Sequence, residues 1–499
     1  MGIRTGQGYL ESLRDGRRVL LDGEVVGDVT RHPRLAGAAR TIAELLDMQH
    51  DATHGPALTY DSPDSGQKVG ISHLVPHTPD DLRRRREGLK TWADATYGMM
   101  GRSPDFMNVM IAALGAAHPF FGAKRSEFGD NMRRYAQHCR EHDIVMTHVL
   151  VNPQVDRSRP VEKQEKDLAA KVVREGDAGF WISGARTVST LAAFSHEVLV
   201  FPSTYLTPSA EAADYAFGCA LPVDAPGITW ISRPAVTSGA TASHADLPLS
   251  NRMDETDAVV IFDEVFVPWE RTFLYRDVEL CNQVYPKTMS GPHAATQSAV
   301  RALAKTEFML ALALSIARST KIDEHLHVQG MIAEIMVFAE TIRAVITASE
   351  VNAKPTPWGT LAPDANALWV VRLGFPKMFV RMQEIVQLLG ASGLVAVPSY
   401  AELQGPGREL VERYYQSAGS DADSRIRLFR LAFDASMSGF AGRQQLYERY
   451  YTGDPVRLAG TLFNLYDKKP HHERMTRILD DIQRRHDQEH EGAMEETRA

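Results

Sequence analysis

Two short segments carry residues that could act together on a phenol. Residues 101–106 (GRSPDF) hold the permanent cation Arg102, and residues 147–153 (THVLVNP) hold the titratable imidazole of His148. A site that deprotonates a phenol needs a cation for the phenolate and a base whose pKa lies near neutrality. The two segments therefore indicate a site that holds and deprotonates a phenol, provided that they meet in the folded chain.

Each of these residues also has a plain structural explanation. Residues 103–105 (SPD) are typical of the N-cap, N1 and N2 positions of a helix, so Arg102 is expected just outside a helix start. There its guanidinium could bind a phosphate, carboxylate or phenolate, or it could tie the helix start to an aspartate. His148 lies in the apolar run 144–151, which predicts a strand, and a lone histidine in a strand could equally belong to the core.

Two further segments could contact a cofactor. Residues 154–157 (QVDR) follow the predicted strand and could hold the ribityl or pyrophosphate part of a dinucleotide, although an ordinary turn closed by an Asp–Arg pair is the alternative. Residues 187–190 (TVST) offer hydroxyls that could reach a flavin, although such residues are common in strands. No G-x-G-x-x-G and no H-E-x-x-H occurs, so we expect neither a Rossmann nicotinamide site nor a bound metal.

Composition narrows the class of protein. The 499 residues carry 55 basic and 63 acidic side chains, a formal charge of −8, without the interleaved basic and aromatic residues that follow a nucleic-acid backbone. The charged run at residues 80–87 is interpreted as a solvated helix face. Three widely spaced cysteines favour a reducing cytoplasm, and the longest apolar run, 308–317, is about half a membrane span. We therefore expect a cytoplasmic protein that binds neither nucleic acid nor membranes.

The spacing of apolar residues changes twice along the chain. It is helical to about residue 140, turns to short β-rich runs as far as about 275, and becomes helical again in long blocks after about 290. We predict an α+β fold with an N-terminal helical domain (1–143), a middle β-barrel domain (144–275), a C-terminal four-helix bundle (276–486) and a disordered tail (487–499). This order suggests the acyl-CoA dehydrogenase architecture, although a fold alone does not assign chemistry.

Five separated motifs carry a resemblance to a known family. They are residues 9–17 (YLESLRDGR), 28–33 (DVTRHP), 97–105 (YGMMGRSPD), His148 with 151–153 (VNP), and 262–270 (FDEVFVPWE). In this order they resemble the oxygenase component of 4-hydroxyphenylacetate 3-monooxygenase, over residues 4 to about 485. The resemblance implies a homotetramer or homodimer that uses FAD, delivered as FADH2 by a separate NAD(P)H:flavin reductase.

The same resemblance implies roles for individual residues. Arg102 and His148 match the pair that holds the substrate phenol, and His293 falls where halophenol-hydroxylating relatives place a histidine beside the ring. Flavin contacts fall on Gln154, Val155, Asp156, Arg157, Thr190, Tyr450, Tyr451, Thr452 and Gly453, and contacts to the substrate side chain fall on Ser203 and Thr204. Phe106 stands where the 4-hydroxyphenylacetate enzymes have tyrosine, which removes a hydroxyl from the substrate pocket.

We therefore expect a monooxygenase that hydroxylates a para-substituted phenol ortho to its hydroxyl, through a flavin C4a-hydroperoxide that needs a dry pocket. Three alternatives stay open. A 4-hydroxybutyryl-CoA dehydratase would need a cysteine-held iron–sulfur cluster, and an acyl-CoA dehydrogenase would use a base such as Glu334 or Glu340. A non-catalytic flavin-fold binding protein is the third.

Overall fold

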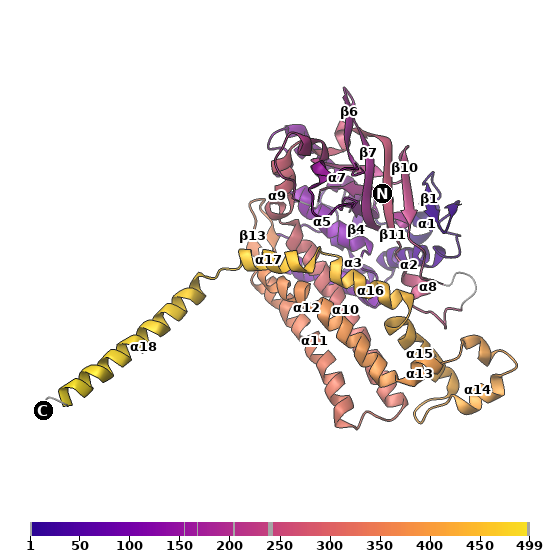
Figure 1. Ribbon diagram of the computed structural model, residues 1–499. Coiled ribbons are helices and arrows are strands. Elements are labelled where there is room, and N and C mark those ends of the chain that lie inside the picture. The colour runs from indigo at the N-terminus through magenta and orange to yellow at the C-terminus, as the bar shows by residue number, and fades with distance from the viewer. Residues whose placement is uncertain (1, 154, 167, 203–204, 238–242, 497–499) are drawn as a thin grey trace. The chain divides into compact units, whose positions relative to one another are not determined.

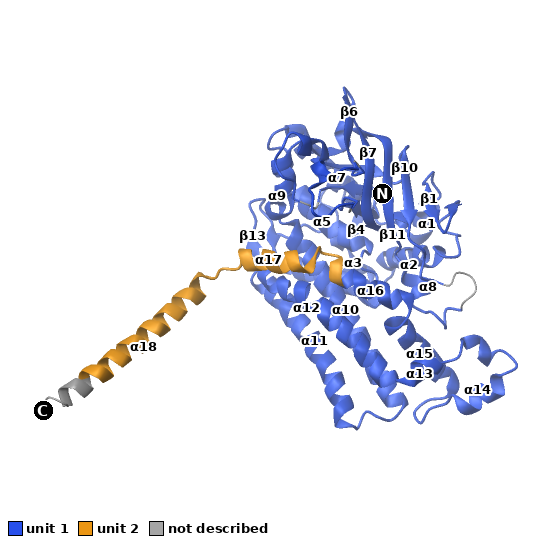
Figure 2. Ribbon diagram, in the orientation of Figure 1, with its two compact units in different colours: residues 1–448 blue, residues 449–499 orange. Residues whose placement is uncertain are grey.

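The computed structural model describes residues 2–496 apart from 154, 167, 203–204 and 238–242 (Figure 1). The chain divides into two compact units, residues 1–448 and residues 449–499 (Figure 2). The first unit takes in all of the predicted helical and β-rich parts and most of the predicted bundle. The domain boundaries predicted at 143/144 and 275/276 lie inside this unit and stay a prediction.

The N-terminal part of the first unit is helical, with short strands between the helices. Its elements are α1 (Gly6–Ser12), β1 (Val19–Leu21), β2 (Glu24–Val26), α2 (Ala36–Asp47), α3 (Gly55–Leu58), β3 (Thr59–Asp61), β4 (Lys68–Gly70), α4 (Pro79–Ala95), α5 (Pro104–Ala116), α6 (His118–Phe121) and α7 (Ser126–Glu141). A capping box begins α4: the Thr78 hydroxyl accepts a hydrogen bond from the Asp81 amide, and the Asp81 carboxylate accepts one from the Thr78 amide.

The middle part is rich in strands. Its elements are β5 (Met146–Val149), β6 (Lys171–Gly176), β7 (Gly179–Thr190), β8 (Glu197–Val200), β9 (Phe217–Pro222), β10 (Ile228–Ser232), α8 (Ser250–Met253), β11 (Asp257–Pro268) and β12 (Thr272–Tyr275). One sheet has the order β2-β1-β10-β11-β7-β6, and a second has the order β12-β9-β8-β5. The strand-rich region is thus where the sequence predicted it, but two of its partner strands come from the N-terminal part.

The middle strands were predicted to close into a β-barrel, and this detail is not confirmed. Within the described residues, neither sheet pairs its last strand with its first, so β2 and β6 remain edge strands. A barrel requires every strand to have two neighbours. Arg174 and Glu175 of the edge strand β6 are both exposed, and charged edges of this kind resist further pairing. Alternating apolar residues predict strands with a buried face, and open sheets satisfy that pattern as well as a barrel does.

The C-terminal part of the first unit is built from long helices. Its elements are α9 (Val278–Thr288), α10 (Ser290–Ser319), α11 (Leu326–Val351), β13 (Lys354–Pro355), β14 (Leu361–Ala362), α12 (Ala365–Gly390), α13 (Ser392–Ala396), α14 (Arg408–Tyr414), α15 (Ala422–Ser436) and α16 (Gly439–Tyr450), whose last two residues fall in the second unit. Helix α10 packs against α4, α5, α11 and α12. Figure 1 shows α11 and α12 alongside α10.

Residues 423–447 have continuous helical periodicity, but they fold as two helices, α15 and α16. The helix is interrupted at Met437 and Ser438, between α15 and α16. The Ser438 hydroxyl accepts a hydrogen bond from the Ala441 amide, as a helix cap does. The Gln383 side-chain amide donates to carbonyls on both sides of the break, those of Ala435 and Ala441, at 3.0 and 3.3 Å. Apolar periodicity continues through the break, so only these polar contacts reveal it.

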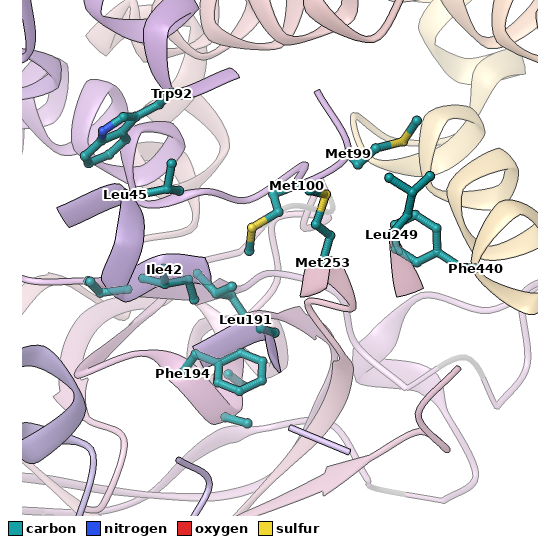
Figure 3. Close-up of a cluster of buried hydrophobic side chains, with 14 of the residues drawn as sticks. Ile42, Leu45, Trp92, Met99, Met100, Leu191, Phe194, Leu249, Met253 and Phe440 are labelled. Atoms are coloured by element: carbon teal, nitrogen blue, oxygen red, sulfur yellow. The ribbon is translucent and has the colours of Figure 1, made fainter. Parts of the chain in front are cut away.

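One apolar core joins the three parts of the first unit. Figure 3 shows Ile42 and Trp92 from the N-terminal helices, Met100 from the loop before α5, Leu191 from the end of β7, and Phe440 from α16 in the same cluster. All five are buried. Burial of each such side chain stabilises the fold by about 1.5–3 kcal/mol, so the loop that carries Met100 is anchored in the core.

The second unit contains α17 (Pro455–Leu465) and α18 (Lys469–Glu496). Residues 487–496, for which the sequence predicted disorder, are helical here. They contain four glutamates and no apolar stripe, so apolar periodicity did not indicate a helix, although Glu, Gln and Ala have good helix propensity. No helix among the described residues is long and apolar enough to span a membrane.

Candidate active site

Three of the predicted site residues converge from two distant segments. The guanidinium carbon of Arg102 lies 3.8 Å from the centre of the Phe106 ring, and the Phe106 ring stacks on the His148 ring with centroids 5.8 Å apart. Arg102 and Phe106 flank the start of α5, and His148 lies in β5 opposite Leu199 of β8. The cation, the aromatic ring and the imidazole therefore form one group, which we call the Arg102–Phe106–His148 trio.

The trio lies in the interior. Arg102 and Phe106 are 7% and 6% exposed, and His148 is partly buried. Two surface cavities, each of about 560 Å³, are lined by other residues. A reaction at the trio would therefore proceed away from bulk water, which strengthens the electrostatic effect of the Arg102 charge.

The backbone at Arg102 is fixed from two sides. The Arg102 amide donates a hydrogen bond of 2.5 Å to the Glu255 carboxylate. A Cβ on Gly101 would lie 2.2 Å from the Tyr447 ring, so only glycine allows α16 to approach the loop this closely. These contacts place the arginine in a preformed position.

The predicted helix start is confirmed, but Ser103 acts differently from an N-cap serine. Helix α5 begins at Pro104 with Ser103 as its N-cap residue, and the Ser103 hydroxyl donates to the Asp105 carboxylate at 2.6 Å instead of accepting from the backbone. Gln297 of α10 also donates to Asp105, at 3.3 Å. Burial raises the pKa of Asp105 to about 6, because the carboxylate loses its hydration.

His148 differs from the near-neutral base that the sequence suggested. Burial, together with the nearby Arg102 charge, lowers its pKa to about 3. The imidazole is therefore neutral at physiological pH and suited to accept a hydrogen bond from a phenol hydroxyl. A phenol has a pKa near 10, so full proton transfer to His148 would need the phenolate itself to raise the imidazole pKa. The fixed charge of Arg102 would thus be the stronger influence on the ionisation of a phenol bound beside it.

His293 contacts an arginine that the sequence placed on the surface. The buried His293 ring accepts a 2.6 Å hydrogen bond at Nδ1 from Nη2 of Arg85, which is itself 1% exposed. The solvated-face interpretation of residues 80–87 is therefore wrong for Arg85, because α4 turns this one position toward α10. An arginine is always a donor, so it fixes Nε2 as the protonated nitrogen of neutral His293. Burial and the Arg85 charge lower the pKa of His293 well below its usual range.

The Thr190 hydroxyl donates to Asp257 at 2.7 Å. Asp257 also accepts hydrogen bonds from Arg443 and Arg233. Two residues near Thr190, Val188 and Leu191, have positive φ values of 61° and 73°. Such strain in non-glycine residues is sustained only where surrounding contacts hold it.

The turn after β5 is a surface feature. Val155 and Arg157 are exposed, and Asp156 accepts hydrogen bonds from the Ser158 amide and hydroxyl and pairs with Arg159 at 3.3 Å. The predicted turn is present, but its aspartate–arginine pair uses Arg159. The remaining predicted contacts at Gln154, Ser203 and Thr204 lie outside the described residues.

Residues 450–453 belong to the second unit. Tyr450 ends α16, and residues 451–453 form the turn before α17, in which Gly453 has a φ of 117° that favours glycine. Their predicted flavin contacts stay a prediction.

Sequence reasoning missed Arg85, Glu255, Arg443 and Tyr447. The acidic run at residues 254–257 before a predicted strand was the available signal for Glu255, whereas Arg443 and Tyr447 looked like ordinary helix residues. Within the described part of the chain, no three His, Cys, Asp or Glu side chains gather around a common point that could hold a metal ion. Cys139, Cys219 and Cys281 are buried and free.

The chain is similar to known proteins over most of its length. Models of the 4-hydroxyphenylacetate 3-hydroxylase N terminal and C terminal families match residues 5–274 and 281–480. The chain is 42% identical over 478 residues to the 4-hydroxyphenylacetate 3-monooxygenase oxygenase component of Thermus thermophilus, which covers 95% of this chain and 97% of that one. The fold and these matches define a flavin-dependent monooxygenase.

The chain belongs to the 4-hydroxyphenylacetate 3-hydroxylase family. A solved oxygenase component of 4-hydroxyphenylacetate 3-monooxygenase, complexed with FAD and 4-hydroxyphenylacetate, superimposes with a TM-score of 0.92 at 41% identity, over 96% of this chain and 99% of that one. The 4-hydroxybutyryl-CoA dehydratase of N. maritimus has a TM-score of 0.86 at 20% identity, over 96% and 95% of the two chains. That second similarity shows a shared fold alone, so the predicted fold class is confirmed and the dehydratase alternative is not favoured.

Proposed function

We propose that the protein hydroxylates a para-substituted phenol ortho to its hydroxyl, with O2 and with reduced FAD from a separate NAD(P)H:flavin reductase. The observation that carries this proposal is the Arg102–Phe106–His148 trio, which gathers a fixed cation, an apolar ring and a neutral imidazole in one largely buried place. Family membership supports the same chemistry. When bound, reduced flavin would supply the electrons that activate O2, which provides the oxygen atom added to the ring.

The roles within the trio follow from charge. Arg102 lowers the pKa of a bound phenol by stabilising the phenolate, which makes the ortho carbon more nucleophilic. Neutral His148 accepts the hydrogen bond from the phenol hydroxyl and so orients the ring. The Phe106 ring packs beneath the Arg102 guanidinium and limits its motion. The third predicted catalytic residue, His293, presents its Nε2 proton as a donor because Arg85 occupies Nδ1.

The polar groups of this chain fit a dinucleotide flavin. Arg157 has an exposed guanidinium and no ion-pair partner among the described residues, which suits a diphosphate. We propose that Val155, Asp156 and Arg157 hold the diphosphate arm, together with Gln154, and that Thr190 faces the ring.

Phe106 is proposed to affect which phenols the site accepts. Tyrosine at this position would add a hydroxyl beside Arg102, and its absence leaves the pocket less selective for a polar para substituent. We propose that 4-hydroxyphenylacetate is accepted, alongside phenols whose para substituent is less polar. Ser203 and Thr204 are the proposed contacts for that substituent.

We also propose that the protein self-associates as a homotetramer or homodimer. Helix α18 carries an apolar stripe, Met475, Ile478, Leu479 and Ile482, in which each side chain is 44–58% exposed. A stripe with this spacing is buried in most stable proteins. A second copy of the chain is the proposed cover, and light scattering that reports a monomer at micromolar concentration would contradict it. A cytoplasmic location fits the three free cysteines.

The decisive experiment is an oxygenation assay. Protein, excess flavin reductase, NADH, FAD and catalase are mixed with a panel of para-substituted phenols, and products are identified by mass. We expect one added oxygen atom on at least one phenol, and no product when the reductase is omitted. Oxidation of NADH without oxygenation of any phenol would overturn the proposed function.

A further inference from the structure

A largely buried chain of hydrogen bonds, in which Asp257 is partly exposed, joins Arg102 to Thr190. The Arg102 amide donates to Oε1 of Glu255 at 2.5 Å, and Nη1 of Arg443 donates to Oε2 of the same carboxylate at 3.0 Å. Arg443 then donates through Nη2 and Nε to the two oxygens of Asp257, at 2.8 and 3.0 Å. Oδ1 of Asp257 accepts the Thr190 hydroxyl at 2.7 Å. One guanidinium thus connects the residue proposed to bind the phenol with the residue proposed to face the flavin.

Burial and charge make this chain rigid. The Glu255 side chain is fully buried, and that of Arg443 is 11% exposed. Burial opposes the ionisation of Asp257, but the Arg443 and Arg233 charges outweigh it and lower its pKa. The neighbouring Asp257 and Glu255 charges likewise overcome burial and raise the pKa of Arg443 well above its usual range. Asp257 and Arg443 therefore stay charged, and loss of either one leaves the other without its partner.

Backbone strain lies at the same place. Thr256, between the two carboxylates, has a φ of 54°, which is unusual for a β-branched residue. The Leu191 amide, itself in a strained residue next to Thr190, donates to the Glu255 carbonyl at 3.2 Å. Strain persists where surrounding contacts determine the conformation, and the ion pairs of Arg443 supply such contacts on both sides of Thr256.

Building on the proposed function, we propose that Arg443 is a positioning residue that sets the distance between the phenol site and the flavin site. It acts through Glu255 on the backbone of Arg102, and through Asp257 on the hydroxyl of Thr190. Arg443 lies one helical turn before Tyr447, and the Tyr447 ring packs against Gly101. Helix α16 therefore supports both the proposed phenol site and the proposed flavin site. Glu255 contacts the Arg102 backbone, whereas Asp257 contacts the Thr190 hydroxyl. Loss of Glu255 should therefore affect the phenol, and loss of Asp257 should affect the flavin.

The test measures two binding affinities in each variant. Calorimetry gives the Kd of 4-hydroxyphenylacetate without flavin, and anaerobic titration gives the Kd of reduced FAD. We expect Glu255→Gln to weaken phenol binding about tenfold with FAD binding changed less than about twofold, and Asp257→Asn to give the reverse pattern. Arg443→Met should weaken both by about tenfold, because it removes the shared support.

Two further variants keep the result interpretable. Arg271→Met removes a different ion pair of the sheets, Arg271 to Glu197 at 2.6 Å, and should leave both affinities unchanged. Arg443→Lys replaces Arg443→Met if the latter fails to fold, and it should weaken both ligands by about threefold, because an ammonium cannot bridge both carboxylates. The inference is overturned if folded Arg443 variants bind both ligands as the parent does, or if the two carboxylate variants weaken both ligands equally. A parent protein that oxygenates no phenol would instead overturn the proposed function.

Discussion

Arg102 and Arg157 are both arginines of the proposed site, but they are held in different ways. Arg102 is 7% exposed, and its backbone is tied to Glu255, far along the chain. Arg157 is exposed, and the described hydrogen bonds of its turn join residues within eight positions of one another. The proposed phenol side is thus preorganised by tertiary contacts, whereas the proposed diphosphate side is a local turn. A preformed charge acts without reorganisation during the reaction, and an exposed one serves for capture of a ligand.

The largest expected effect comes from breaking the preorganised side. Arg102→Ala should lower product formation per turnover of reduced FAD by about 100-fold or more, because the phenolate loses its cation. The measurement is the ratio of product to NADH consumed at saturating phenol. Arg102→Lys is the matched variant, and full coupling in the alanine variant would show that Arg102 is not the phenol's cation.

A substitution within the trio should change selectivity. Phe106→Tyr restores a hydroxyl beside Arg102, so we expect kcat/KM for 4-hydroxyphenylacetate to rise about tenfold relative to that for 4-ethylphenol, whose para substituent has no charge. Competition between the two phenols gives this ratio directly. An unchanged ratio would mean that position 106 does not contact the para substituent.

A smaller effect is expected on the exposed side. Arg157→Ala should weaken FAD binding about three- to tenfold, the scale of one charge-assisted hydrogen bond near water, and should leave phenol affinity unchanged. Anaerobic titration of reduced FAD at two salt concentrations measures it. Arg159→Ala, which removes the neighbouring ion pair with Asp156, is the control, and an equal loss in both variants would argue for loosening of the turn.

The smallest expected effect concerns stability against pH. His148 has a folded-state pKa of about 3, below its unfolded value near 6.5, so the unfolded chain binds more protons between these values. Its contribution is fully present above pH 6.5 and is lost as the pH falls toward 3. His148→Asn should therefore show a shallower loss of Tm between pH 6.5 and 4.5 than the parent. The exposed His472→Asn should match the parent, and an equal slope in His148→Asn would contradict the low pKa.

Local sequence determined much of this protein. The residue pattern 103–105 predicted the start of α5, the apolar run 144–151 predicted β5, and the order of helical and β-rich segments predicted the fold class. These features depend on neighbours within a few positions, which a sequence displays directly. The motifs also indicated Arg102 and His148, although not that Phe106 would lie against both.

Only the tertiary structure decided the electrostatics and the connections. Arg85 looked solvated because its charged neighbours are, and helix packing alone turned it toward His293. The pKa of His148 depends on burial, and whether the sheets close depends on how their edge strands pair. The link from Arg102 to Thr190 runs through Arg443, which is more than 180 residues away from its carboxylate partners. Such contacts join residues without a common period or motif, so they exist only after the chain has folded.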